Sequence, residues 1–269
     1  PRVPADSADS GVAADGMSGA ALGPSFGNDE IGDWLESIGV ESEVESDPEA
    51  RNARVATELA AGSVVGWFDG RMEFGPRALG HRSILADPRS PTVQSDVNIR
   101  VKGRESFRPF APAVMWEHAT EWFDIDAPAP YMLLTFPVAE ARLVPVTIEP
   151  DDFVERVKVV RSEIPACTHI DGSARVQTVH RETNPEFHAL LGAFNDATGC
   201  PVLLNTSFNR AGEPIVCTPE DALATAVAAG LDLLVMGDRL IRPEAADHDP
   251  PIVDASGSAT EDAASPGAG

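Results

Sequence analysis

The chain has 269 residues, of which 43 are acidic and 20 basic, and its formal net charge is −23. With 43% hydrophobic residues, it has enough apolar side chains to bury a sizeable core in one large domain or two small ones. The charge argues against duplex DNA and an anionic membrane as partners of the whole molecule, because both are polyanions and would be repelled.

Cysteine and histidine spacing gives no sign of a disulfide framework or a zinc site. The three cysteines form no CxxC pair, and the six histidines show no HExxH or similar spacing. No apolar run approaches the length of about 18 residues that indicates a membrane helix, and the chain does not start like a signal peptide. We therefore expect a cytoplasmic protein without a dedicated metal site.

The acidity is concentrated at the two ends of the chain. Residues 60 to 243 contain 24 acidic and 17 basic side chains, so the flanks contribute most of the net charge. Only two of the basic residues, Lys102 and Lys158, are lysines. This composition is typical of a halophile-like surface, in which salt screens the repulsion between acidic groups. Acidic tails alone would explain the flanks, but they would not explain the shortage of lysine.

Taken in chain order, the sequence predicts a disordered segment over residues 1–22, an ordered domain over 23–243 and a disordered acidic tail over 244–269. Both ends are rich in Ala, Ser, Gly, Pro and Asp and lack apolar periodicity. Within the domain, three helix starts combine a capping side chain with a proline at the first helical position, and a glycine follows each helix. These helices open at Asp47-Pro48, Asn184-Pro185 and Thr218-Pro219, and end near Gly62, Gly199 and Gly230.

An apolar strand is predicted after each of these helices, in SVVGWF, PVLLNT and LDLLVM. Further strands are expected at 109–115, 131–138 and 175–179, where apolar or β-branched runs are bounded by Pro, Gly or Asp. Helices alternating with strands indicate an α/β (α+β) domain with a largely buried mixed sheet and flanking helices.

Residues 71–108, which we call the cationic island, are the strongest candidate for an anion site. The segment contains eight basic and four acidic residues, against the overall negative charge. Its glycines would allow the backbone to approach a ligand, and guanidinium groups bind phosphate or carboxylate through two hydrogen bonds. The alternative is a solvated turn whose arginines, Arg71, Arg77 and Arg82, pair with Glu73 and Asp87. A second basic cluster, at Lys102, Arg104 and Arg108, favours phosphate binding over that alternative, although Glu105 could serve to orient Arg104 or Arg108.

Two downstream motifs supply polar groups. HIDGSARVQTV places His169 and Arg175 around a turn, where His169 is either a general base or hydrogen-bond donor, or a structural residue. LLNTSFNRAGEPIV leaves an apolar strand for a polar loop that includes Ser207 and Asn209. Open α/β sheets bind ligands at such strand ends, whereas loop capping is the alternative. No GxSxG motif surrounds Ser207, so we do not expect it to be a nucleophile.

Together these motifs resemble one family. GRMEFGPRALGHRSILADPR, NIRVKGRESFRPFAPAV, HIDGSARVQTV and LNTSFNRAGEPIVCTPEDA are similar, in this order, to the C-terminal domain of the O-carbamoyltransferases, which include nodulation-factor and antibiotic-tailoring enzymes. The resemblance extends over roughly residues 22 to 243. It implies a YrdC-like fold and the formation of carbamoyl adenylate and pyrophosphate from carbamoyl phosphate and ATP.

The resemblance also implies roles for the candidate residues. Lys102 and Arg104 would form the phosphate or adenylate site, and Arg77, Arg82 and Arg108 the surrounding anion shell. Arg175, His169 and the Ser-x-Asn pair Ser207 and Asn209 would complete the nucleotide and carbamoyl contacts. Mg²⁺ is expected to accompany ATP and to be held by its phosphates.

In this family an N-terminal actin-like domain passes the carbamoyl group to a hydroxyl of the acceptor. We find no counterpart of that domain in this sequence, so we expect transfer to require a separate or missing partner domain. A different class of function stays open: a catalytically idle nucleotide- or RNA-binding YrdC-like module. The net charge of −23 argues against RNA.

Overall fold

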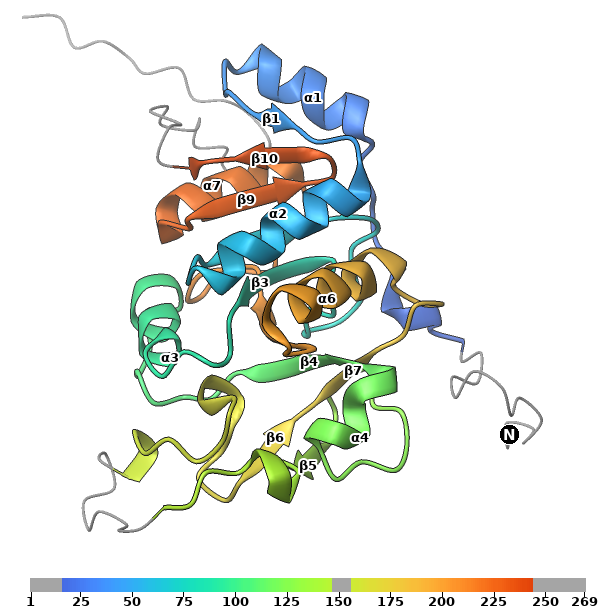
Figure 1. The fold of residues 1–269 in the computed structure, drawn as a ribbon. Helices are drawn as coiled ribbons and strands as arrows, with labels where there is room; N and C mark the ends of the chain where they lie inside the picture. The colour runs from blue at the N-terminus through green and yellow to red at the C-terminus, as the bar shows by residue number, and fades with distance from the viewer. Residues whose placement is uncertain (1–15, 147–155, 244–269) are drawn as a thin grey trace, which may run out of the picture.

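The structure is a computed structural model and describes residues 16–146 and 156–243 (Figure 1). Residues 1–15 of the predicted N-terminal disordered segment, and the whole predicted tail 244–269, lie outside the described residues. Residues 16–22 are described and include a short 3₁₀ turn, η1 (Ser18–Ala20). Ala20 is buried there, and its carbonyl accepts a hydrogen bond from the backbone N–H of Phe74. This part of the predicted disordered segment therefore contacts the rest of the described chain.

The three predicted helices are confirmed as α2 (Pro48–Ala60), α6 (Pro185–Thr198) and α7 (Pro219–Ala229). Each predicted capping side chain accepts a backbone N–H in the first turn: Asp47 from Glu49 at 3.0 Å, Asn184 from Phe187 at 3.1 Å and Thr218 from Asp221 at 3.3 Å. Gly199 and Gly230 adopt the left-handed conformation that ends a helix. Local capping chemistry thus sets these boundaries. The chain also forms two short α-helices, α3 (Val93–Asp96) and α4 (Ala119–Trp122), and the longer α1 (Asn28–Ser37).

Eight strands form one mixed sheet in the order β1-β10-β9-β2-β3-β8-β4-β7. Two pairs of neighbours are parallel, β2 with β9 and β4 with β7. The other five pairs are antiparallel. This arrangement confirms the predicted α/β class with a mixed sheet. The strands span β1 (Glu43–Val44), β2 (Val65–Phe68), β3 (Arg82–Ala86), β4 (Ala111–Met115), β7 (Gln177–Val179), β8 (Val202–Ser207), β9 (Leu233–Met236) and β10 (Arg239–Ile241).

Two of the predicted strands differ from those observed. Of residues 131–138, only β5 (Thr135–Pro137) is a strand, and it pairs with β6 (Ser173–Arg175) in a separate two-stranded sheet. The predicted strand 175–179 is divided at Val176, so that Arg175 ends β6 and Gln177 begins β7. The sequence did not predict β3, because it starts with an arginine after a loop rich in glycine and arginine.

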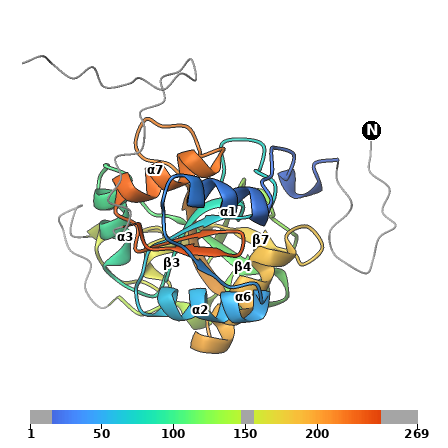
Figure 2. The same cartoon turned by 90° about the horizontal axis from the view of Figure 1, so that it is seen from above.

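The helices cover both faces of the large sheet. Seen from above, α1 and α7 lie on one side of the strands, and α2 and α6 lie on the other (Figure 2). Helices α2 and α6 pack closely against each other. A single large apolar cluster fills the interior, with Trp67 and Phe68 from β2, Phe187 and Phe194 from α6, and Phe208 beyond β8. This packing fixes the relative positions of the loops that leave the sheet.

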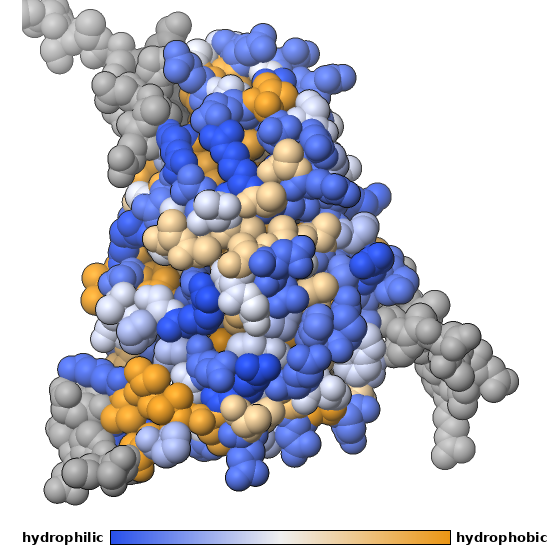
Figure 3. Space-filling model, viewed as in Figure 1, coloured by the Kyte–Doolittle hydropathy of each residue, from blue (hydrophilic) through white to orange (hydrophobic). Residues whose placement is uncertain are grey.

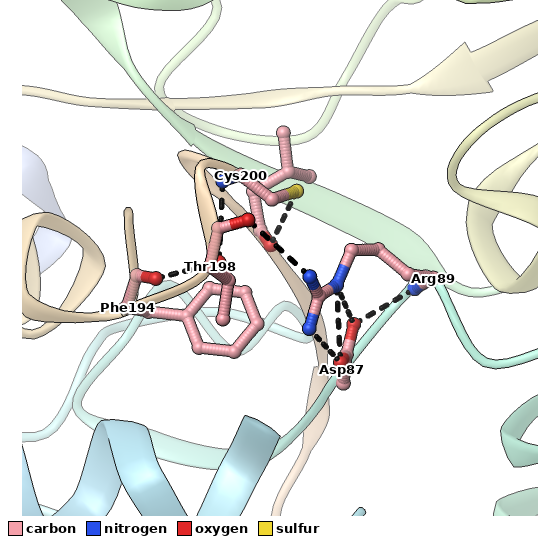
Figure 4. A network of polar contacts seen from close by, with 6 residues as sticks. Asp87, Arg89, Phe194, Thr198 and Cys200 are labelled. Atoms are coloured by element: carbon pink, nitrogen blue, oxygen red, sulfur yellow. Dashed lines mark hydrogen bonds and ion pairs between the residues drawn. The ribbon is translucent and has the colours of Figure 1, made fainter. Parts of the chain in front are cut away.

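A polar network closes the end of α6 against the loop that follows β3 (Figure 4). The Arg89 guanidinium donates to both oxygens of Asp87, at 2.9 and 2.6 Å, and lies 5.5 Å from the centroid of the Phe194 ring. It also donates to the carbonyl of Thr198 in the last turn of α6 at 3.4 Å, where a cation complements the helix dipole. Arg89 belongs to the cationic island, but its contacts give it a structural role.

Hydrophilic residues cover most of the face shown in Figure 3, in keeping with the charged composition. Within residues 16–146 and 156–243, we find no helix with the length and hydropathy needed to cross a membrane.

Gly80 provides a test of how the loop before β3 is held. Its φ is +98°, and a Cβ at this position would lie 2.1 Å from the Phe187 ring. Gly80→Ala should therefore lower the free energy of unfolding by about 3 kcal/mol, through both backbone strain and overpacking. Gly62→Ala is the matched control, since Gly62 has a φ of +97° and a Cβ added there would meet nothing within 4 Å. We expect it to cost about 1 kcal/mol, measured by urea unfolding. Equal losses in the two variants would contradict the packing argument.

Candidate functional site

A cavity of about 440 Å³ brings together residues from most of the predicted site motifs. Four arginines line it, Arg77, Arg104, Arg108 and Arg175, and none of the described residues that line it is acidic. The remaining lining residues are Pro76, Ala78, Pro109, Phe110, Ala111, Met132, Thr135, His169, Asn205, Thr206 and Ser207. A cavity with four guanidinium groups and no carboxylate in its wall is suited to an anion.

The loop that carries Arg77 is held in place by hydrogen bonds to the side chain of Glu73. The Glu73 carboxylate is buried, and one of its oxygens accepts the backbone N–H groups of Leu79, His81 and Arg82 at 2.6 to 3.3 Å. Glu73 thus organises the backbone of this loop, whereas the solvated-turn interpretation supposed that it pairs with arginine side chains. Arg77 remains at the exposed edge of the cavity.

Arg82 does not belong to this cavity, although the sequence placed it in the anion shell. It is fully buried at the start of β3, and its guanidinium lies 3.6 Å from the centroid of the Phe68 ring. Its Nη atoms donate to the carbonyls of Asp69, Gly70, His81 and Pro24. Burial lowers the pKa of Arg82 to about 10. The side chain therefore fastens the loop onto the sheet, because its Nη donors already bind backbone carbonyls.

The second basic cluster follows a π-helical turn, η2 (Val97–Val101), an element that is often found at functional sites. Asn98, which is buried in this turn, accepts a hydrogen bond from Arg104 Nε at 2.6 Å. Its amide nitrogen donates to the carbonyls of Ser106 and Arg108 at 3.1 and 2.8 Å. Gly103 has a φ of +51°, which allows the chain to turn between Lys102 and Arg104. Because of this turn, the side chains of Lys102 and Arg104 have different hydrogen-bond partners.

Lys102 connects the island to the predicted Ser-x-Asn pair. Its ammonium group lies within 3.3 Å of four oxygen atoms, namely the carbonyls of Ser207 and Asn209, Ser207 Oγ and Asn209 Oδ1. Ser207 Oγ also donates to Asn209 Oδ1 at 2.7 Å. Lys102 is 6% exposed, and burial, together with the charge of Arg104, lowers the pKa of its ammonium group to about 7. The structure thus brings Lys102, Ser207 and Asn209 together beside the cavity, with Ser207 in its wall.

His169 and Arg175 both line the cavity, His169 from the turn before β6 and Arg175 from the end of β6. His169 Nδ1 lies 3.0 Å from Ser173 Oγ, which donates to Asp171 at 2.7 Å. Burial lowers the pKa of His169, so the imidazole is largely neutral at pH 7. This turn supports β6 and presents Arg175 to the cavity.

Burial and neighbouring positive charges lower the pKa of two of the cavity arginines, Arg104 and Arg175. Burial lowers the pKa of Arg104, and the nearby charges of Arg108 and Arg175 lower it further. Burial likewise lowers the pKa of Arg175, with a further contribution from the charge of Arg77. Arg108 also has an acidic neighbour, because its Nη1 lies 4.0 Å from Glu105. A bound anion would relieve the repulsion among these groups, since it would place negative charge between them.

Sequence reasoning did not identify Asn98 or Gln177 as organising residues. Gln177 is buried at the start of β7, where its amide nitrogen donates to the carbonyl of Leu79 at 2.8 Å. Neither residue lies in a motif that points to a ligand. The residues next to Asn98 and Gln177 in the sequence do not distinguish these two from ordinary polar side chains at the end of a strand or helix.

Comparisons with known proteins identify the family. The family model described as carbamoyltransferase C-terminus matches residues 56–243, which is more than half of the chain. The chain therefore belongs to this family, as its sequence motifs predicted. It is 51% identical, over 82% of its length, to an uncharacterized protein of Synechocystis sp..

Two named relatives support the same assignment. The chain is 42% identical, over 82% of its length, to the nodulation protein NolO of Bradyrhizobium diazoefficiens. It is 36% identical, over 82% of its length, to the 3'-hydroxymethylcephem-O-carbamoyltransferase of Amycolatopsis lactamdurans. The matches cover 37% of the Synechocystis protein, 37% of NolO and 41% of the Amycolatopsis enzyme. The chain thus spans about two fifths of the length of these relatives.

The lowered pKa of Lys102 makes anion binding depend on pH. Because Lys102 loses its proton as the pH rises through about 7, the affinity for sulfate should fall by about tenfold between pH 6 and pH 8.5. Sulfate suits the measurement, by titration calorimetry, because it does not itself titrate in this range. In Lys102→Met the affinity should be low at both pH values and nearly independent of pH. An undiminished pH dependence in that variant would assign the effect to another group.

Proposed function

We propose that this chain provides the carbamoyl-adenylate-forming site of an O-carbamoyltransferase. The observation that carries the proposal is the convergence of Arg77, Arg104, Arg108 and Arg175 on one cavity without an acidic wall residue. Both proposed substrates, carbamoyl phosphate and ATP, are anions. Membership of the carbamoyltransferase C-terminus family and the name of one relative, the 3'-hydroxymethylcephem-O-carbamoyltransferase, support the choice of a carbamoyl group.

The proposed chemistry proceeds in two steps. Water cleaves carbamoyl phosphate to carbamate and inorganic phosphate, and a carbamate oxygen then attacks the α-phosphorus of ATP. The bond between the α- and β-phosphates breaks, and pyrophosphate leaves. Negative charge is spread over the phosphoryl oxygens in this transition state, so fixed cationic donors in a cavity would stabilise it without having to reorganise.

The residues take roles according to their positions. Arg104 binds the phosphates or the adenylate, and Lys102, beside the cavity, holds Ser207 and Asn209 in place and adds positive charge. The exposed arginines Arg77 and Arg108, together with the half-buried Arg175, neutralise the remaining charge. His169, which is largely neutral, donates or accepts a hydrogen bond at the nucleotide.

ATP brings Mg²⁺ with it in this proposal. Within the described residues no group of three or more His, Cys, Asp and Glu side chains is arranged to hold a metal ion. The phosphates and water would therefore supply most of the magnesium ligands, as they commonly do.

Transfer of the carbamoyl group to an acceptor hydroxyl is assigned to a second, actin-like domain. The relatives are more than twice as long as the region that this chain matches, which leaves room for such a domain. We propose that it receives the adenylate made here and binds the acceptor.

Carbamoyl-phosphate-dependent exchange of labelled pyrophosphate into ATP tests the proposal directly. The purified chain, assayed at high salt with Mg²⁺, should catalyse this exchange. Arg104→Ala and Lys102→Ala should each reduce the rate by at least about a hundredfold, since the first removes a charged donor from the cavity and the second removes the positive charge that holds Ser207 and Asn209 beside it. Arg100→Ala is the matched control: Arg100 belongs to the cationic island, but it pairs with Asp232 at 3.0 Å and does not line the cavity.

The same assay separates the enzyme from an idle binding module. If ATP binds but no exchange occurs under any of these conditions, adenylate formation is excluded and a nucleotide-binding module remains. If Arg100→Ala loses as much activity as Arg104→Ala, the cavity is not the site of the reaction.

A further inference from the structure

The wall of the cavity contains one acceptor that the arginines do not explain. Asn205, on β8, is 1% exposed and lines the cavity together with Ser207, two residues further on, on the same face of the strand. Its side-chain oxygen Oδ1 is buried and has no hydrogen-bond partner. Buried polar atoms are nearly always satisfied in native proteins, so an unpaired acceptor in a cavity wall indicates a missing donor.

A chain of hydrogen bonds fixes which atom of Asn205 is left unpaired. Gln177 donates through Nε2 to the carbonyl of Leu79 at 2.8 Å, so its Oε1 faces Asn205. Asn205 Nδ2 donates to this Oε1 at 2.8 Å and to the carbonyl of Ala78 at 3.2 Å. Backbone carbonyls can only accept, and rotating the Asn205 amide by 180° would place its oxygen against two other oxygens. The network therefore leaves Oδ1 as the free atom.

The cavity thus combines two opposite requirements. Its guanidinium groups can donate hydrogen bonds but cannot accept them, whereas Asn205 Oδ1 can accept hydrogen bonds but cannot donate them. A sulfate or a carboxylate would satisfy the arginines but would offer no hydrogen to Asn205. The complementary ligand is an anion that carries an N–H group a short distance from its charge.

We infer that Asn205 accepts a hydrogen bond from the NH₂ group of the carbamoyl ligand and makes the site specific for carbamoyl over acyl groups. This inference rests on the proposed function, because it takes the carbamoyl anion to be the ligand. Gln177 is a positioning residue that holds the Asn205 amide in the required orientation. A site built to accept an N–H discriminates strongly against an analogue that lacks it, because the buried acceptor is then left unpaired.

The test compares carbamoyl phosphate with acetyl phosphate, in which a methyl group replaces the NH₂ group. In the wild-type chain, titration calorimetry should show carbamoyl phosphate binding at least about tenfold more tightly. In Asn205→Ala the affinity for carbamoyl phosphate should fall to that for acetyl phosphate, while acetyl phosphate and sulfate bind as before. Gln177→Leu should reduce the preference in part, because Asn205 can then rotate.

A merely structural role for Asn205 would lower the affinities for all three anions together, and that result would overturn the inference. So would equal binding of the two acyl phosphates by the wild-type chain, a measurement that needs no variant and is unaffected if Asn205→Ala fails to fold. If the preference is found but pyrophosphate exchange is not, the recognition of the carbamoyl group stands and the proposed adenylation fails.

Discussion

The cavity depends on cationic side chains that are held close together around a space whose described lining residues include no carboxylate. Burial and repulsion lower the pKa of Arg104 and Arg175, and burial lowers that of Lys102. The groups stay in place because neutral oxygens hold them, as Asn98 holds Arg104 and the Ser207 and Asn209 oxygens hold Lys102. Neutral acceptors position a cation without cancelling its charge, so the charge stays available to a ligand.

The sheet decides where these groups meet. β8 lies between β3 and β4, so the loop before β3, the segment before β4 and the end of β8 are neighbours in space. Arg82 and Glu73 fasten the first of these segments, and Asn98 fastens the second. Residues far apart in the chain can then line one cavity. Arginines of the same segment that serve the scaffold, such as Arg89, face away toward the helices.

Much of the fold and part of the site could be predicted from the sequence. The starts of α2, α6 and α7 followed from their capping side chains, and β2, β4, β8 and β9 from their apolar runs. The two basic clusters were correctly expected to converge. Arg82, which the sequence placed in the anion shell, does not line the cavity, because its Nη groups donate to carbonyls whose positions depend on the fold. Residue type alone does not distinguish a guanidinium that binds backbone from one that faces a ligand.

The sequence by itself determined the elements with short-range causes and the family, because capping, apolar patterning and motif order are all legible along the chain. Only the tertiary structure decided which arginines share a cavity, that Lys102 is buried against Ser207 and Asn209, and that Asn205 Oδ1 is unpaired. These properties arise from contacts between residues about 100 positions apart, such as Gln177 with Leu79 and Lys102 with Ser207. Such contacts depend on strand order and register, which no local pattern encodes.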